Sequence, residues 1–273
     1  MRLLFMILLT LTAFAANSVL NRGALVDGST GPMAYSVVRL LSGALVLWGL
    51  VAVQNGFWRP RLHPVSAIAL TTYIISFSIA YVTLDAGLGA LILFGGVQLT
   101  MFTLALFVRE KVRWPAYVGA FVSFGGLCVL FLPSAELHID VVSVGIMICG
   151  AMGWGAYSFI GKGSSDPMVE TAQNFVWALP LALIAFSLSP DAITIYGATL
   201  GVMSGAVTSS IGYALWYSIL PKLRTSSAAV LQLSVPILAS VAGIIFLDEF
   251  FTWQLGIATT LVITGTCITL RRG

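Results

Sequence analysis

Apolar stretches of about twenty residues fill nearly the whole chain. An α-helix rises 1.5 Å per residue, so about 20 apolar residues cross a hydrocarbon core about 30 Å thick. Charged residues, glycines and prolines separate ten such stretches, at 3–21, 33–53, 65–84, 88–108, 114–132, 141–161, 168–188, 195–219, 226–247 and 252–270. The loops between them are too short to form a domain. The sequence therefore predicts an all-α integral membrane protein with ten transmembrane helices.

The composition agrees with this prediction. Charged residues make up 8% of the chain and apolar residues 59%, whereas a soluble domain carries about 25% charged residues. The Lys and Arg residues are scattered singly and form no basic stripe, so nucleic acid is not an expected partner. Cys128, Cys149 and Cys267 lie in apolar runs without metal-ligand spacing. We therefore expect no disulfide, metal or cofactor.

The first stretch has a second interpretation. Arg2, an apolar run and Ala13-Phe14-Ala15 resemble a secretory signal with its small-residue cleavage site. We favour a transmembrane helix, because the segment continues through Leu20 and has a counterpart in the second half of the chain.

Positive charge is distributed unevenly between alternate loops, and cytoplasmic loops of membrane proteins retain Lys and Arg. With the N-terminus in the cytoplasm, only Arg22 falls on the opposite side. The cytoplasmic side then holds Arg2, Arg59, Arg61, Arg109, Lys111, Arg113, Lys162, Lys222, Arg224, Arg271 and Arg272. The sequence predicts a multi-pass plasma membrane protein, in a bacterium one of the inner membrane, with both termini cytoplasmic.

The two halves of the chain repeat each other. An offset of 139 residues pairs Glu110 with Glu249, Trp114 with Trp253, Gly126 with Gly265 and Cys128 with Cys267, and an offset of 140 pairs Arg22 with Lys162. A five-helix unit has an odd number of crossings, so its second copy is inverted. We predict two inverted repeats, residues 1–135 and 139–273, around a central cavity. Such repeats are typical of transporters that work by alternating access, although a purely structural duplication or a channel are alternatives.

The chain resembles the drug/metabolite transporter superfamily and its EamA family. Glu110 and Glu249 each close an apolar helix before a Gly-rich one, and Pro236, Gly243, Glu249, Gly256 and Gly265 fit the family pattern. Asp248 stands where glycine is usual, Arg109 precedes Glu110, and Val97 replaces a proline. The chain looks most like bacterial aromatic amino-acid exporters of the YddG type. The resemblance implies export of small amphipathic metabolites such as amino acids, through a cavity lined by helices one, three, four, six, eight and nine.

Polar and aromatic residues near the middle of those helices are candidate substrate ligands. Buried Tyr, Trp and Asn need hydrogen-bond partners that lipid does not supply, although aromatic stripes more often serve packing. Trp154 and Tyr157 share one helix face, and Gly150, Gly153 and Gly155 are expected to leave room beside the indole. The predicted substrate-binding set is Asn17, Tyr73, Ser76, Tyr81, Gln98, Trp154, Tyr157, Tyr213, Trp216 and Gln232.

Arg39 is the one charged residue well inside a predicted span. It either clamps a substrate carboxylate or, in the interpretation that we favour, is a scaffold arginine that snorkels outward or binds neighbouring carbonyls. Glu110 and Glu249 are expected to face the N-terminus of the next helix, which is a structural role. No Asp or Glu lies at the middle of a span, so we expect a facilitator without a proton relay.

Other functions fit less well. An intramembrane enzyme needs a nucleophile with a base, paired carboxylates or metal ligands within the spans, whereas His63 and His138 lie in loops on opposite sides. A cationic or amphipathic xenobiotic is the alternative cargo, and a sugar phosphate would need several cations. We expect no obligatory protein partner besides the lipid bilayer.

Overall fold

The computed structural model describes residues 2–56, 58–110, 114–130, 140–250 and 252–270, which contain helices and no strand. In chain order the elements are α1 (Arg2–Leu25), α2 (Pro32–Asn55), α3 (Pro64–Ala80), α4 (Ala86–Phe107), α5 (Trp114–Leu130), α6 (Val141–Gly161), α7 (Pro167–Leu188), α8 (Ile195–Met203), the π-helical η1 (Ser204–Ser209), α9 (Ser210–Ile219), η2 (Leu220–Lys222), α10 (Thr225–Leu231), η3 (Gln232–Ser234), α11 (Val235–Leu247) and α12 (Trp253–Leu270). The predicted boundary between the halves, 135–139, lies outside the described residues.

Six helical segments in the described part are long and apolar enough to cross a membrane, namely Arg2–Leu25, Pro32–Asn55, Ala86–Phe107, Val141–Gly161, Pro167–Leu188 and Thr225–Leu247. The last of these joins α10, η3 and α11. Two further apolar helices, Pro64–Ala80 and Trp253–Thr269, are shorter. The prediction of an all-α membrane protein is therefore confirmed, and the number of crossings stays a prediction.

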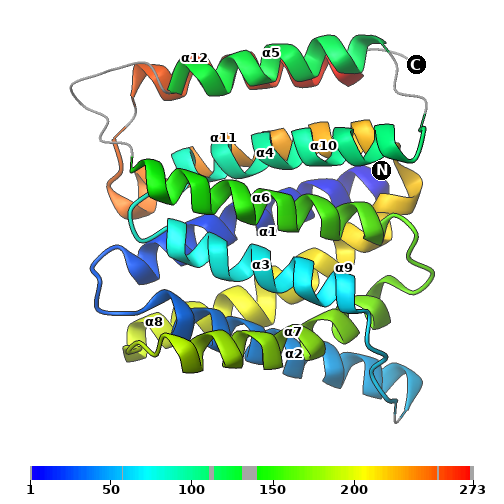
Figure 1. Ribbon diagram of the computed structural model, residues 1–273, viewed down its shortest axis with the longest axis vertical. Coiled ribbons are helices and arrows are strands. Elements are labelled where there is room, and N and C mark those ends of the chain that lie inside the picture. Colours follow the sequence, from blue (N-terminus) through cyan, green and yellow to red (C-terminus); the bar gives the residue numbers. More distant parts are fainter. Residues whose placement is uncertain (1, 57, 111–113, 131–139, 251, 271–273) are drawn as a thin grey trace.

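The helices lie roughly parallel in layers (Figure 1). One edge consists of α5 and α12, which pack closely on each other. A Cβ atom on Gly119 of α5 would collide with the backbone oxygen of Gly265 in α12, so glycine allows this close contact. In the centre, α3 and α4 pack on α6, and α1 packs on α11 and on the segment from α8 to α9. At the other edge α2 contacts α7 and α8.

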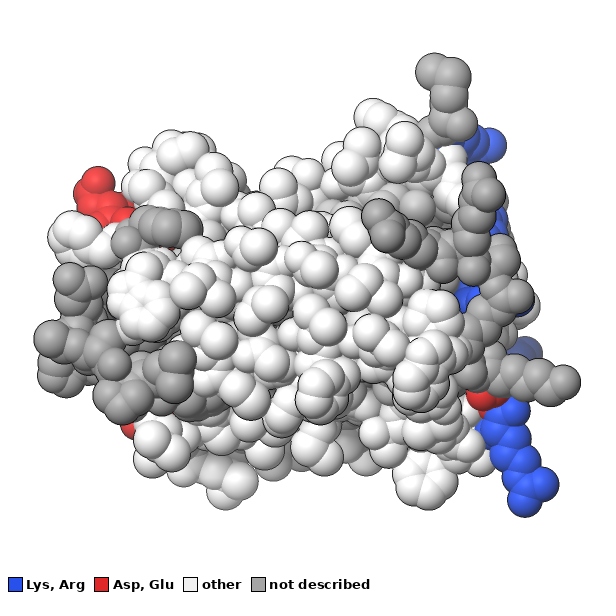
Figure 2. All heavy atoms as spheres, turned by 90° about the horizontal axis from the view of Figure 1, so that it is seen from above, with Lys and Arg blue, Asp and Glu red and all other residues white. Residues whose placement is uncertain are grey.

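Charge separates to the two ends of the helices. On the face drawn in Figure 2 basic side chains gather at one end and acidic ones mostly at the other, with a band of uncharged residues between them. Contacts across the bundle agree, because Asp85 and Glu249 lie near Arg22 at one end and Glu110 contacts Lys162 at the other. We call these the acidic end and the basic end. The start of α1 and the end of α12 both lie at the basic end (Figure 1).

Two left-handed residues stand immediately before the paired glutamates. Arg109 has φ 56° and Asp248 has φ 53°, and they are the two non-glycine residues of the described chain with positive φ. Each ends a helix, and the N–H of the following glutamate returns to a carbonyl of the last turns, Ala105 or Gly243. Since glycine adopts this conformation without steric cost, glycine would fit both positions without strain.

Candidate substrate site

A cluster of aromatic rings occupies the centre of the bundle. The Trp154 ring centroid lies 4.9 Å from that of Tyr73, 4.6 Å from Tyr213 and 5.4 Å from Tyr157. Phe14 of α1 meets Trp154 edge-on at 5.2 Å. Each of these five side chains is at most 4% exposed. The predicted central cavity is therefore filled by rings in this conformation.

Hydrogen bonds between helices satisfy several of the polar groups in and around this cluster. Trp154 Nε1 donates to Gln232 Oε1 at 2.6 Å, and Trp216 Nε1 donates to Ser158 Oγ at 3.1 Å. The hydroxyls of Tyr213 and Tyr73 bond each other at 3.1 Å. The indole and phenol groups are thus fixed by partners on other helices, which orients their rings.

Arg39 enters the cluster from α2 and is completely buried. Its Nε donates to Ser209 Oγ at 3.0 Å and its Nη2 to the Tyr213 hydroxyl at 2.6 Å, with Tyr73 at 3.4 Å. The guanidinium carbon lies 5.3 Å from the Phe77 ring centroid. Arg39 neither snorkels outward nor binds neighbouring carbonyls, so the contacts expected for a scaffold role were wrong. The guanidinium is anchored by hydroxyls and rings.

The π-helical segment η1 brings hydroxyls to Asn17. Asn17 Oδ1 accepts hydrogen bonds from Ser204 at 2.8 Å, Thr208 at 2.6 Å and Ser209 at 3.2 Å. A Cβ atom on Gly205 would collide with the Arg39 carbonyl, so this segment packs directly on the backbone of α2. Single π-helical turns are frequent at functional sites. Ser209 thereby links Asn17 to Arg39.

The acidic end is closed by contacts between the first and second halves of the chain. Arg22 Nη1 donates to the carbonyls of Tyr81 at 3.1 Å and Val82 at 2.8 Å, and Nη2 reaches Asp85 at 3.3 Å. Glu249 accepts the Ala86 N–H, at the start of α4, at 2.7 Å, and its carboxylate lies 3.9 Å from Arg22 Nε. We call Arg22, Asp85 and Glu249 the acidic-end closure.

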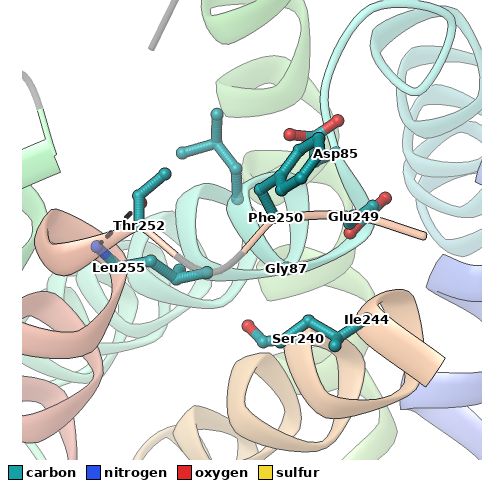
Figure 3. Close-up of a pocket in the computed structure, with 9 residues that line it drawn as sticks. Asp85, Gly87, Ser240, Ile244, Glu249, Phe250, Thr252 and Leu255 are labelled. Carbon is teal, nitrogen blue, oxygen red and sulfur yellow. Dashed lines mark hydrogen bonds between the residues drawn. The ribbon is translucent and has the colours of Figure 1, made fainter. Parts of the chain in front are cut away.

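A recess of about 310 Å³ lies against this closure and includes Arg22, Asp85 and Glu249 in its lining. Figure 3 shows the adjoining pocket, where Glu249 lies beside Gly87 of α4 and Ser240 and Ile244 rise from α11.

The basic end is closed by an equivalent set of contacts. Glu110 accepts hydrogen bonds from Lys162 Nζ at 2.9 Å, from the Thr225 hydroxyl at 2.5 Å and from the Thr225 N–H, at the start of α10, at 3.3 Å. We call Glu110, Lys162 and Thr225 the basic-end closure. Each glutamate thus binds the N-terminus of a helix in the other half. The expectation that it faces the next helix in sequence was wrong.

The two glutamates differ electrostatically. Burial raises the pKa of Glu249, because the Ala86 N–H and the charge of Arg22 only partly compensate and Asp85 adds repulsion. Burial also acts to raise the pKa of Glu110, but the hydrogen bonds from Thr225 and Lys162 and the charge of Lys162 outweigh it and hold the pKa below its ordinary value. The carboxylate form is therefore more stable at the basic end.

Most predicted site residues come together, and three do not. The central cluster contains four of the predicted residues, Tyr73, Trp154, Tyr157 and Tyr213. Three more are linked to it: Asn17 accepts a hydrogen bond from Ser209, Gln232 accepts one from Trp154, and the Trp216 ring packs on Phe14. Tyr81 lies toward the acidic end, where its hydroxyl donates to Ala86 O. Ser76 is half-buried and faces Gly150 across the α3–α6 contact, and Gln98 is buried without a hydrogen bond to the cluster among the described residues.

The glycines beside Trp154 do not leave a space. A Cβ atom on Gly153 would lie 2.7 Å from the Ala69 carbonyl oxygen, and one on Gly155 would lie 2.7 Å from Thr100 Cβ. Neighbouring helices therefore use these glycines for close packing, contrary to expectation. The sequence reasoning also missed Phe14 and Ser209. An apolar ring and a common hydroxyl carry no signal of their own, although Phe14 lies one turn from Ser18 and Asn17 on the same helix.

The overall geometry agrees with known proteins. A protein of known crystal structure superposes with a TM-score of 0.77 and 17% identity, over 97% of this chain and 98% of that one, which shows a shared fold. An uncharacterized protein of Pseudomonas aeruginosa is 37% identical over 98% of this chain and 94% of its own length. A probable amino-acid metabolite efflux pump of Escherichia coli is 24% identical over 76% of this chain and 77% of its own. An uncharacterized transporter of Archaeoglobus fulgidus is 23% identical over 88% and 87%.

These comparisons define the class as a multi-pass membrane transporter, which points away from an enzyme. Residues 142–271 match the EamA-like transporter family. The match lies in the second half of the chain.

Proposed function

We propose that the protein is an alternating-access exporter of small amphipathic metabolites, in particular aromatic amino acids. The carrier crosses the bacterial inner membrane ten times, as two inverted five-helix repeats, with the basic end and both termini in the cytoplasm. The cargo binds at the central cluster, against Asn17, Tyr73, Trp154, Tyr157 and Tyr213.

The pairing of helices supports the inverted repeats. An exchange of the halves would replace each helix by its counterpart in the other half. The α3–α6 contact then becomes the contact of α8 and α9 with α1, and α4–α6 becomes α11–α1. The α2–α8 contact becomes α7–α3, and all six contacts are present. The contacts α2–α7, α4–α11 and α5–α12 each map onto themselves. This is the pattern of a two-fold axis that passes through the bundle centre.

Residues 140 positions apart meet at that centre. Tyr73 and Tyr213 bond each other, and Phe14 contacts Trp154. Such equivalent pairs are in contact only close to the axis that relates them. The central cluster is therefore the point at which the two repeats would exchange, and transporters of this type bind substrate near it.

The observation that carries the proposal is the matched pair of closures on either side of the cluster. Arg22 and Lys162 are 140 residues apart, and Glu249 and Glu110 are 139 apart. At each end a cation lies at the end of a central helix, and a glutamate contacts both this cation and the N-terminus of a helix of the other half. With both closures formed the cluster is sealed, and release of one closure at a time gives access from one side.

Transport by purified protein in liposomes tests this function. We expect exchange of labelled aromatic amino acids into vesicles preloaded with the same unlabelled compound, and none into protein-free vesicles. A panel that includes aliphatic amino acids and a quaternary ammonium compound distinguishes a xenobiotic carrier. Reporter fusions after Arg61 and after Asp140 should report cytoplasm and exterior, respectively. Exchange of no member of the panel would contradict the proposed function.

A further inference from the structure

Arg39 is a buried cation without a counterion. Its side chain is fully buried between α2, α3 and α9, and the ion pairs of the described residues all lie at the two ends of the bundle. A charge inside a membrane span is costly and is normally paired. Hydroxyls and rings offset part of this cost, but they leave the positive charge in place.

Two hydrogen-bond donors at Arg39 and Asn17 also lack an acceptor among the described residues. Arg39 Nη1 and Asn17 Nδ2 are both buried and both lack an acceptor in the described structure. They belong to side chains that bind the same Ser209 hydroxyl, at 3.0 and 3.2 Å. The Asn17 oxygen is already occupied by three hydroxyls, so only its N–H groups remain available. Two unpartnered N–H donors on side chains that share Ser209, together with one uncompensated charge, match a carboxylate, which accepts at two oxygens.

We propose that Arg39 and Asn17 bind the carboxylate of the cargo, and that the substrates are apolar or aromatic monocarboxylates for which an amino group is dispensable. This inference rests on the proposed transport function and deepens it. The carboxylate supplies the missing counterion and the missing acceptors, while the cargo's ring lies against Trp154 and Tyr73. The two residues come from α1 and α2, so the anion site belongs to the first half of the chain.

The described chain places no carboxylate at Arg39 and Asn17 to receive an ammonium group. Its Asp and Glu residues lie in or beside the loops and at the helix starts, and none has a hydrogen bond or ion pair to Arg39 or Asn17, although Glu170 at the start of α7 acts electrostatically on Tyr157. An amino group would meet neutral oxygens and the charge of Arg39. Amino acids therefore bind through their carboxylate, and amines that lack one are excluded.

Four compounds that share a phenyl ring separate these features: 3-phenylpropanoate, phenylalanine, phenylalaninamide and phenethylamine. Binding is measured as the rise in the unfolding temperature of the purified protein, and transport as flux into liposomes. We expect both carboxylates to bind, and the amide and the amine to bind at least tenfold more weakly. Equal binding of phenethylamine and 3-phenylpropanoate would overturn the proposal.

Variants at the anion site give an independent test. Arg39→Gln should abolish the preference for carboxylates, and Arg39→Lys should retain part of it. Because Arg39→Gln also removes packing, Asn17→Asp is the sharper variant: it places a carboxylate beside Arg39 within the protein. Asn17→Asp should raise the unfolding temperature without ligand and abolish the response to 3-phenylpropanoate. A lower unfolding temperature together with an unchanged ligand response would overturn the proposal.

The two readouts separate the two proposals. Carboxylates that bind in an Arg39-dependent way but are not transported would contradict the transport function and leave the anion site standing. Transport of all four compounds at equal rates would contradict the anion site and leave the transport function standing. Ser187, exposed on α7 with its hydroxyl donating to the Leu183 carbonyl of the same helix, provides a control, because Ser187→Ala should change neither readout.

Discussion

Glu110→Gln is expected to open the basic end of the carrier, whereas Glu249→Gln should leave the acidic end nearly closed. Glu110 accepts hydrogen bonds from Lys162 and twice from Thr225. A hydrogen bond to a charged group contributes about 1.5–3 kcal/mol and a neutral one about 0.5–1.5. The Glu110 and Lys162 side chains are 26% and 31% exposed, so solvent screening reduces the difference. Loss of the charge should therefore cost the closed state about 1–2 kcal/mol.

That cost corresponds to about a 5- to 30-fold change in the ratio of closed to open basic end. The acidic end differs because Glu249 lies 3.9 Å from Arg22, beyond hydrogen-bond distance. A glutamine oxygen still accepts the Ala86 N–H, and Arg22 keeps the carbonyls of Tyr81 and Val82. We therefore expect Glu249→Gln to cost the closed acidic end less than about 1 kcal/mol, which changes the ratio of closed to open acidic end by less than about 5-fold.

Two serines one turn inside the closures allow a matched assay. Ser18 precedes Arg22 by four residues, Ser158 precedes Lys162 by four, and both are fully buried. In a background with Cys128, Cys149 and Cys267 replaced by alanine, Ser18→Cys and Ser158→Cys report opening of the acidic and the basic end through the rate of thiol labelling. Glu110→Gln should accelerate labelling at position 158 by about 5- to 30-fold and leave position 18 unchanged.

Glu170→Gln is the control for loss of an acid at the basic end. Glu170, in the first turn of α7, accepts a hydrogen bond from the Ser165 N–H of the preceding loop, and this bond does not connect the two halves. Equal acceleration by Glu170→Gln and Glu110→Gln would mean that surface charge, and not the closure, controls access. Stronger opening of the acidic end by Glu249→Gln than of the basic end by Glu110→Gln would refute the hydrogen-bond reasoning.

Three further predictions concern affinity, coupling and the loops. Trp154→Phe keeps a ring but loses the bond to Gln232, so the apparent affinity for an aromatic carboxylate should fall by up to about tenfold; wild-type affinity in a protein of normal thermal stability would exclude Trp154 from the site. With no acid at the middle of a described span, net flux down a substrate gradient should persist after a protonophore collapses the proton gradient, and loss of that flux would reveal a coupling site. Arg109→Gly removes the left-handed strain and should raise the free energy of unfolding by up to about 1 kcal/mol, measured by thermal denaturation, whereas Arg59→Gly should not.

The pKa shift of Glu249 gives a fourth prediction. Burial raises its pKa in the closed acidic end, so that closed state binds a proton more tightly than an open state with a hydrated carboxylate. Protonation of Glu249 therefore stabilises the closed acidic end at low pH, and this stabilisation is lost as the pH rises through the raised pKa. Labelling of Ser18→Cys should therefore slow as the external pH falls toward the ordinary carboxyl range. Glu249→Gln provides the control for thiol chemistry, and an unchanged pH dependence in that variant would contradict the assignment.

The helices were predictable because their signal is local. Apolar length alone placed nearly every span within a few residues of the observed helix, and prolines such as Pro32, Pro64 and Pro167 mark helix starts. The interruptions were not predictable. Residues 204–209 have no sequence feature that demands a π-helix, and their hydroxyls find Asn17 only after α1 has packed on this segment.

The residue types of the candidate site could be predicted from the sequence, but the contacts between these residues could not. Burial of Tyr, Trp and Asn follows from their position in apolar helices, so the cluster itself was expected. The target of each glutamate was not, because Glu110 and Glu249 bind helices that are more than 100 residues away in sequence. The contacts of Arg39 depend likewise on Ser209 and Tyr213, which the fold alone brings to it.

In the central cluster the proposed repeats relate two tyrosines of the two halves to each other, whereas the charged group is present in one half. The proposed carrier needs both features. Tyr73 and Tyr213 are 140 residues apart and bond each other, so in the proposed inverted repeats an exchange of the halves preserves their contact. Arg39 has no cationic counterpart, because α7, which corresponds to α2, contains no Arg or Lys, and Asn17 has Tyr157 as its counterpart 140 residues later. A symmetric pair of arginines would place two repelling charges in one low-dielectric site. Because Arg39 is the one cation at the centre of the described chain, a single bound carboxylate neutralises it. In the proposed carrier this carboxylate stays bound to α1 and α2 while the acidic-end and basic-end closures open in turn.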